Sequence, residues 1–401
     1  EPHSSSGASA GISAAPVESG SVSVLHVSFN QDCSSLAVGL SNGYALYSVS
    51  SSGDKLDELH RWCSEAVSIV ERHYSSSLVA AVMLAQPRRL RVMHFKKGTE
   101  ICSCNYQEPV LTVRLSRQRL VVCLADSLHL HSLQDMKVVH TVRDSTGNRQ
   151  GLCALCSDQD ACMLAYPANG SGGTGEARVF DAMALRQLCS IPAHNSPLAA
   201  LAFNSTATRL ATASEKGTVI RVYSVPDGER VAEFRRGVKR CVQLHSLAFS
   251  RDSSLLACCS NTETLHVFCL DPQQQHLEKQ QQQQQQTNQQ QSWASWAYRA
   301  TSAYLPAALS QDRDFATARL STGSRSGPGR SVCALAYIGR QLRLLCAMSG
   351  DVGQLAIYDV DERLGGDCQL AGLLDLRGGR AAEDATAAPV AVAATVVPEN
   401  A

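Results

Sequence analysis

LAALAFNSTATRLATASEKGTVIRVYSV, residues 198–225, and LHSLAFSRDSSLLACCSNTETLHVFCL, residues 244–270, are two copies of one pattern. Phe203 aligns with Phe249 and Ser214 with Ser260, both 46 residues apart. Each copy contains three short runs of alternating β-branched or apolar residues, split by polar turns, as in half-buried β-strands. A repeat of about 40–50 residues with four strands is typical of a β-propeller blade.

The same pattern returns along most of the chain. VLHVSFNQDCSSLAVGLSNGYALYSV, residues 24–49, is a third clear copy. Weaker copies lie at 66–107, 109–143, 151–190 and 331–377. We therefore expect an all-β protein with a single seven-bladed, WD-repeat-like β-propeller over residues 22–377, although the sequence contains no Trp-Asp dipeptide. The repeats do not indicate how the ring closes.

Three segments fall outside the repeat. Residues 1–21 are small and polar, and residues 378–401 are rich in Ala and Val, so both are expected to be disordered. Residues 271–314 interrupt the sixth repeat and contain a Gln tract, which we interpret as a tolerated expansion. FATARL, residues 315–320, should then supply the fourth strand of blade 6.

Composition excludes several classes of protein. The 36 Lys and Arg balance the 36 Asp and Glu, so bulk charge cannot coat a nucleic acid or a membrane, and no nucleic-acid partner is expected. No apolar run approaches the length of a membrane-spanning helix, and the first residues lack the apolar stretch of a signal peptide. The 16 scattered cysteines suggest buried free thiols in a reducing, cytoplasmic compartment, without a metal site.

The motif FRRG, residues 234–237, follows the fifth repeat. Adjacent arginines on an extended segment point to opposite sides, so Arg235 and Arg236 can each serve a different pocket. Their planar guanidinium groups suit paired hydrogen bonds to phosphate oxygens, and we expect Gly237 to permit a turn that a side chain would block. A charged loop is more often just solvated, but hydroxyl and imidazole side chains recur on both neighbouring repeats.

The sequence resembles the PROPPIN family of phosphoinositide-binding propellers, also called WIPI proteins. The likeness runs from about residue 22 to 377. It rests on AHNSPLAALAF (193–203), ATASEKGTVIRV (211–222), EFRRGVKRC (233–241), SNTETLHVF (260–268), HFKKGTEIC (94–102), RQRLVVCL (117–124), LCALC (152–156) and SAYLP (302–306).

The resemblance implies binding of phosphatidylinositol 3-phosphate and phosphatidylinositol 3,5-bisphosphate in two pockets, one on each side of the FRRG motif. Residues for the first pocket are Arg235, His194, Ser214, Thr218 and Arg221. Residues for the second pocket are Arg236, Ser260, Thr262, Thr264 and His266. It also implies a cytoplasmic protein that is peripheral on phagophore and endosomal membranes, with no cofactor.

The insert carries aromatic residues at helical spacing. Trp293, Trp296 and Tyr304, with Ala297 and Ala300, fall on one face of a helix, and Tyr298 and Leu305 add apolar surface. Such rings suit a bilayer interface, and in the resembled family this loop dips into the membrane. The alternative is a helix packed on the rim of the propeller.

The resemblance implies one protein partner. In the family, a basic groove between blades 2 and 3 recruits the autophagy conjugation scaffold, the Atg16-type protein, through an acidic helix. His94, Lys97 and Arg117 match that groove, whereas Gln134 stands where a cation is expected. Solubilising charge at strand edges is the alternative.

Other functions remain as alternatives. The sequence lacks HExxH, GxSxG and a phosphate-loop Gly-Lys-Ser/Thr, so we expect no enzyme and no catalytic residues. A protein-interaction scaffold that binds no lipid is the second class. Autophagosome formation is the leading process, and endolysosomal traffic or organelle maintenance is the alternative.

Overall fold

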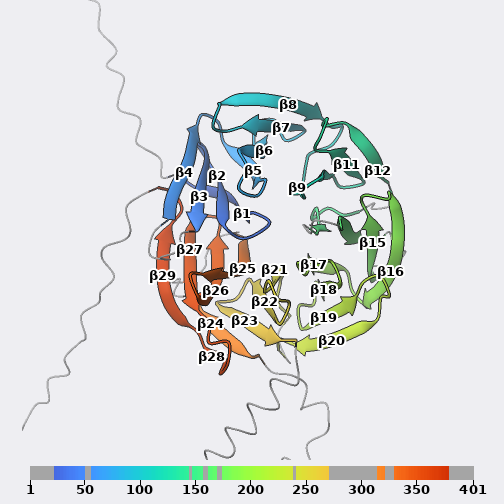
Figure 1. Cartoon of the computed structure of the whole chain (residues 1–401), viewed down its shortest axis with the longest axis vertical. Coiled ribbons are helices and arrows are strands. Elements are labelled where there is room, and N and C mark those ends of the chain that lie inside the picture. Colours follow the sequence, from blue (N-terminus) through green and yellow to red (C-terminus); the bar gives the residue numbers. More distant parts are fainter. Residues whose placement is uncertain are drawn as a thin grey trace, which may run out of the picture.

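The computed structural model describes residues 22–49, 56–143, 147–156, 161–168, 174–237, 241–270, 314–320 and 329–378. In this part of the chain every regular element is a β-strand, and the strands form seven sheets arranged in a ring, antiparallel except for one short outer strand (Figure 1). The predicted seven-bladed propeller is therefore confirmed. The described residues contain no helix that is long and apolar enough to cross a membrane.

Each sheet is one blade, and its strands follow one another in the chain. Blades 1 to 3 are β1 (Val24–Phe29), β2 (Ser35–Leu40), β3 (Gly43–Val49) and β4 (Leu56–Cys63); β5 (Val67–Arg72), β6 (Leu78–Met83), β7 (Arg89–His94) and β8 (Thr99–Asn105); β9 (Thr112–Leu115), β10 (Arg119–Cys123), β11 (Leu128–Ser132) and β12 (Val138–Val142). Blades 4 and 5 are β13 (Ala154–Leu155), β14 (Met163–Pro167), β15 (Gly175–Asp181) and β16 (Arg186–His194); β17 (Leu198–Phe203), β18 (Arg209–Ser214), β19 (Val219–Ser224) and β20 (Arg230–Arg235). Blades 6 and 7 are β21 (Leu244–Phe249), β22 (Leu255–Ser260), β23 (Thr264–Cys269) and β24 (Ala316–Arg319); β25 (Ser331–Ile338), β26 (Gln341–Met348), β27 (Gln354–Asp359) and β29 (Gln369–Asp375).

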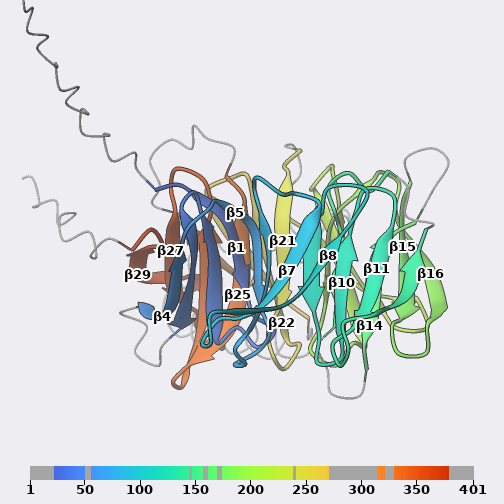
Figure 2. The ribbon, with the colours of Figure 1, turned by 90° about the horizontal axis from the view of Figure 1, so that it is seen from above.

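The first strand of each blade lines the centre of the ring and the fourth lies on the rim (Figure 1). Seen from the side, the strands run between the two faces of the ring, so the connecting turns gather on these faces (Figure 2). β24 occupies the rim position of blade 6, which confirms that FATARL supplies the fourth strand.

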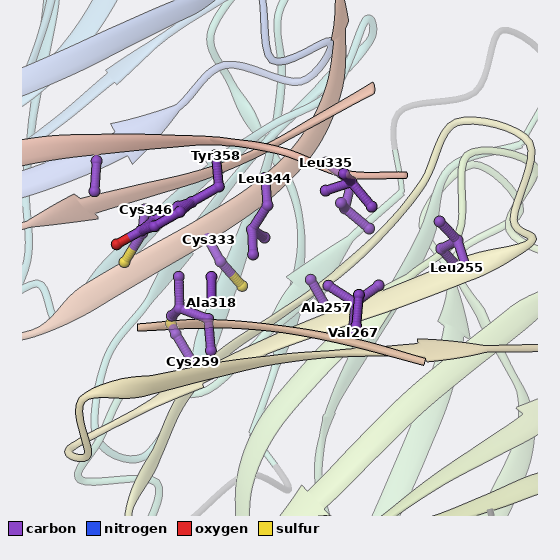
Figure 3. Packing of buried hydrophobic residues seen from close by; sticks show 14 of the residues in the cluster. Leu255, Ala257, Cys259, Val267, Ala318, Cys333, Leu335, Leu344, Cys346 and Tyr358 are labelled. Carbon is purple, nitrogen blue, oxygen red and sulfur yellow. The ribbon is translucent and has the colours of Figure 1, made fainter. Parts of the chain in front are cut away.

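The hydrophobic core is divided among the gaps between blades. Buried residues form seven clusters, and each cluster draws its members from two neighbouring blades. Figure 3 shows the cluster between blades 6 and 7, where Leu255 and Val267 face Leu335 and Leu344. Because each sheet has two apolar faces, the pattern requires a neighbour on both sides and closes the chain into a ring.

Ring closure needs no strand shared between blades 1 and 7. The backbone N–H of Gly350 donates to the carbonyl of Val24 at 2.7 Å, and the Tyr47 hydroxyl donates to the carbonyl of Leu376 at 3.1 Å. The apolar cluster between these two blades completes the contact.

Blade 6 carries one additional strand on its rim. β28 (Gly366–Asp367), which lies between β27 and β29 in the chain, pairs in parallel with β24. The Thr317 hydroxyl donates to Asp367 Oδ1 at 2.9 Å, and the Tyr358 hydroxyl donates to the carbonyl of Arg319 at 2.7 Å. Blade 7 therefore holds the outer strand of blade 6 in place.

All 16 cysteines have free thiols, and nine of them are buried. Several belong to the apolar clusters between blades, such as Cys259, Cys333 and Cys346 in Figure 3. The prediction of buried free thiols is therefore confirmed, and these residues pack as small hydrophobic side chains.

The turn between β18 and β19 depends on a glycine. Gly217 has a φ of +62°, and a Cβ added there would lie 1.8 Å from the carbonyl oxygen of Val242 in blade 6. Gly98 has nearly the same φ, +63°, but open space around it. We expect Gly98→Ala to lower the free energy of unfolding by about 1 kcal/mol through backbone strain alone, and Gly217→Ala to lower it by about 3 kcal/mol. Urea unfolding followed by tryptophan fluorescence measures both changes, and equal losses in the two variants would contradict this account.

Candidate functional site

The FRRG motif lies where the chain passes from blade 5 to blade 6. Arg235 is the last residue of β20, opposite Val219, and the N–H of Arg236 donates to the carbonyl of Thr218 at 3.1 Å. Phe234 is fully buried, and its ring stacks on Phe268 of blade 6 with centroids 4.9 Å apart. The phenylalanine thus fixes the backbone from which the two arginines project.

Arg236 contacts the hydroxyls of blade 6. Its Nη2 donates to Ser260 Oγ at 3.0 Å and to Thr262 Oγ1, and the two hydroxyls lie 2.9 Å apart. Its Nε is buried and has no hydrogen-bond partner among the described residues. Burial lowers the pKa of Arg236, and no carboxylate among those residues forms an ion pair with it. The positive charge of this half-buried guanidinium is therefore not paired with a carboxylate among the described residues and can attract an added anion.

His266, also expected for the second pocket, lies on β23. Its Nδ1 lies 2.7 Å from Oδ2 of Asp314, and its ring stacks on Phe268 with centroids 6.3 Å apart. Asp314 was not predicted, because it lies 48 residues further along the chain, beyond the insert. Thr264 begins β23, opposite Arg319, and is half-buried.

The residues expected for the first pocket lie on blade 5 and at the end of blade 4. His194 ends β16, and its Nε2 lies 3.0 Å from Thr212 Oγ1, with both side chains buried. Burial, with a further contribution from the charge of Arg221, lowers the pKa of His194 to about 4. This imidazole is therefore neutral near pH 7 and can offer a hydrogen bond but no charge.

Arg221 is occupied by contacts within the protein. Its Nε donates to Glu233 Oε2 at 2.8 Å, and its Nη1 donates to the carbonyl of Ala193 at 2.6 Å. Glu233, directly opposite Arg221 on β20, was not singled out from the sequence, although strand pairing could have indicated it. By contrast, the side chain of Arg235 is exposed, and no hydrogen bond or ion pair joins it to residues that the structure describes. Its charge contributes to the lowered pKa of Glu233, after the larger effects of Arg221 and Arg230. Lys216, in the turn between Ser214 and Thr218, is a second exposed cation on this side.

The two arginines lie in different surroundings, because Arg236 contacts blade 6 while Arg235 is exposed. Ser214 is buried at the end of β18, and Thr218 is half-buried in the turn that follows. The expectation for Gly237 is wrong in this structure. Its φ is not positive, and an added Cβ would meet no atom of the described residues within 4 Å.

The three basic residues of the predicted partner groove meet around one turn of blade 2. His94 ends β7 beside the turn after β5, and the N–H of Lys97 donates to the carbonyl of His94 at 3.1 Å. The guanidinium of Arg117, from blade 3, lies over the ring of Tyr74 in that turn at 4.4 Å. These turns lie at the end of the strands opposite to the FRRG motif.

The residues predicted to insert into the membrane, Trp293, Trp296, Tyr298, Tyr304 and Leu305, lie outside the described residues. The same holds for the Gln tract and for both terminal segments.

Comparisons with known proteins agree on one family. A family model described as PROPPIN matches residues 23–376. WD repeat domain phosphoinositide-interacting protein 1 of Xenopus laevis is 46% identical over 92% of this chain and 84% of its own length. WD repeat domain phosphoinositide-interacting protein 2 of Gallus gallus is 48% identical over 88% of this chain and 79% of its own length. Autophagy-related protein 18 of Caenorhabditis elegans is 38% identical over 79% of this chain and 78% of its own length.

Solved structures agree on the fold. Kluyveromyces lactis Hsv2 is similar with a TM-score of 0.66 and 19% identity, over 89% of this chain and 100% of that chain. The structure described as the complex of KlAtg21 with the coiled coil of AgAtg16 matches with a TM-score of 0.68 and 22% identity. The match covers 88% of this chain and 99% of that chain.

The buried His194 makes stability depend on pH. The unfolded chain protonates this side chain near its ordinary pKa of 6.5, whereas the folded chain does so only near 4. The unfolded state therefore binds more protons between these values, and the free energy of unfolding should fall as the pH drops through this window, by up to about 1.4 kcal/mol per pH unit. Urea unfolding from pH 7 to pH 4 should show a shallower fall in His194→Asn. If the free energy of unfolding of His194→Asn fell with pH as steeply as that of the wild type, the lowered pKa of His194 would not be the cause. Part of the slope should remain, because burial also lowers the pKa of His26 to about 3.

Proposed function

Because this chain belongs to the PROPPIN family, we propose that it is a phosphoinositide effector that binds phosphatidylinositol 3-phosphate and phosphatidylinositol 3,5-bisphosphate through two pockets beside the FRRG motif. The relatives named above carry phosphoinositide interaction and autophagy in their names. The proposal extends these properties to this chain and assigns Arg235 to the first pocket and Arg236 to the second.

One observation carries the proposal: Arg236 is held between hydroxyls with no paired carboxylate. Ser260 Oγ accepts from its Nη2 at 3.0 Å, while its buried Nε has no partner among the described residues. A phosphate monoester could accept from the guanidinium and from the hydroxyls together, and charge-assisted bonds of this kind are the strong ones. Thr264 and His266 line the same side of blade 6, where they can meet inositol hydroxyls.

We assign the charge of the first pocket to Arg235. Arg221 is paired with Glu233, and His194 is neutral near pH 7. Ser214, Thr218 and His194 add neutral hydrogen-bonding groups. A pocket of this kind should bind one head group weakly.

Two weak pockets on one rigid rim give useful affinity. Once the first head group is bound, the second binding event is intramolecular, and its effective concentration multiplies the affinity. The neutral net charge favours this mode, because a polybasic surface would bind any anionic membrane. We further propose that the aromatic residues of the insert, which the sequence places on one helical face, add apolar contact with the bilayer.

The same proposal places the protein on membranes where 3-phosphorylated lipid is dense, the phagophore and endosomes, in autophagosome formation. A scaffold in endolysosomal traffic or organelle maintenance is the alternative, and failure to bind lipid would favour it. We also propose that His94, Lys97 and Arg117 bind the coiled coil of an Atg16-type scaffold. KlAtg21, a structural relative, was solved with such a coiled coil.

Lipid binding should depend on the two arginines. We expect the full chain to float with liposomes containing phosphatidylinositol 3-phosphate, and Arg235→Thr/Arg236→Thr to remain in solution, with at least a tenfold loss of affinity, because each pocket loses its charge-assisted bonds. Arg340→Thr/Arg363→Thr is the matched control, since it removes two exposed arginines from blade 7. If neither the wild type nor the control floats, or if all three chains float equally, the lipid proposal fails.

Partner binding should depend on the opposite face of the ring. Lys97→Glu/Arg117→Glu should abolish the capture of a purified Atg16-type coiled coil, because an acidic helix would then meet like charge. The same variant should still float with liposomes. Retained capture would remove these residues from the partner site and leave the lipid pockets untouched.

A further inference from the structure

A surface hollow lies between blades 3 and 4, away from both proposed pockets. It has a volume of about 410 Å³. Its lining residues come from β12, β14, β15, β16 and the residue after β12: His140, Thr141, Val142, Arg143, Tyr166, Phe180 and Gln187. A volume of this size is within the range of ligand sites.

The hollow lies in the gap between blades 3 and 4, as the residues assigned to the second pocket lie in the gap between blades 5 and 6. Val142, opposite Leu128, belongs to the cluster between blades 3 and 4, just as Phe234, opposite Ile220, belongs to the cluster between blades 5 and 6. Arg143, the next residue, therefore corresponds to Arg235. The ring of His140 stacks on Phe180 of the next blade, with centroids 5.2 Å apart and 21° between the ring planes, and Phe180 corresponds to Phe268.

The chemistry at this place differs from that of the second pocket. Leu164 pairs with Phe180 as Leu256 pairs with Phe268, so these two leucines are equivalent. Four residues after each leucine stand Ala168 in blade 4 and Ser260 in blade 6, so the hydroxyl of Ser260 is missing here. Its lining includes the rings of His140, Tyr166 and Phe180, and Thr141 supplies its one aliphatic hydroxyl. One cation remains: Arg143 is exposed and makes no hydrogen bond or ion pair with residues that the structure describes. A multiply phosphorylated head group would find too few donors in this hollow.

The strand beside the hollow presents apolar surface. β12 is the outermost strand of blade 3, with no strand paired to its outer edge among the described residues. Val138 and Val139, next to His140, are 50% and 38% exposed. An open strand edge with exposed valines can accept an extended chain by backbone hydrogen bonds.

We propose that this surface is a docking site for an extended segment of a partner protein that carries an aromatic or large aliphatic residue next to an Asp or Glu. The apolar side chain fills the hollow over Tyr166 and Phe180, the acidic side chain pairs with Arg143, and the backbone lies along β12. A buried aromatic anchor beside one charge pair is the usual composition of a binding hot spot. Arg143 and Arg117 lie at opposite ends of the strands of blade 3, so this site is separate from the proposed coiled-coil surface.

Synthetic peptides test the proposal directly. The probes are fluorescein-labelled ten-residue peptides of alternating Val and Thr with one central Phe and one Asp, placed one, two or three residues from the Phe on either side. Fluorescence anisotropy with the full chain measures their affinity. We expect at least one peptide to bind, and to bind at least tenfold more weakly to Arg143→Glu, because a charged hydrogen bond is replaced by repulsion.

Control variants separate this site from general charge effects. Arg340→Glu makes the same charge change on exposed surface of blade 7 and should bind the peptide like the wild type. A peptide with Lys in place of Asp should recover binding to Arg143→Glu, and Ser in place of Phe should abolish binding to the wild type. Arg143→Glu should still float with liposomes, so this test is independent of the lipid proposal.

The proposal is overturned if no peptide in the panel binds, if Arg143→Glu binds as tightly as Arg340→Glu, or if the Phe is dispensable. Displacement of the peptide by inositol 1,3-bisphosphate that requires Arg143 would also overturn it, because the hollow would then be a third head-group site.

Discussion

Every blade of this ring is a small sheet with two apolar faces, and neither face is covered unless another blade lies against it. The seven clusters of buried residues are therefore all shared between neighbours, including the one that joins blade 7 to blade 1. This shared burial fixes the angle and height of each blade relative to the next. Groups at the edges of two blades are consequently held at defined distances, although they are far apart in the chain.

The FRRG motif uses this constraint. Phe234 belongs to the cluster between blades 5 and 6, so the arginines that follow it start from a position set by the core. The hydroxyls of Ser260 and Thr262 lie at the edge of the same cluster, where Arg236 reaches them without a flexible loop. A site built on rigid strands loses little conformational entropy on binding, which matters for pockets that each bind weakly.

The fold could be predicted from the sequence, because the strand period and the repeat are local signals. The FRRG motif is a local signal too, and it indicated candidate residues on both neighbouring blades. The contacts that modify the site were not predicted. The pairing of Arg221 with Glu233 depends on which strands are neighbours, and the contact of His266 with Asp314 crosses an insert of unrelated composition. Ring closure and the additional strand β28 depend on contacts between residues far apart in the chain, which a repeat does not encode. The prediction for Gly237 was wrong because the presence of a glycine in a sequence does not show how closely other residues approach it in the fold.

A ring of seven similar blades has seven gaps between neighbouring blades, and the core requires only that the interior of each gap be filled by apolar side chains. The side chains at the outer edge of each gap are free to differ. Between blades 5 and 6 this edge holds an arginine with two hydroxyls, whereas between blades 3 and 4 it holds an arginine beside a hollow lined by Tyr166 and Phe180, with Ala168 at the position of Ser260. Because the backbone frame is the same, the side chains alone determine whether such a place suits a phosphate or a peptide. Binding properties in this architecture should therefore be inferred for each gap between blades separately, from its own side chains.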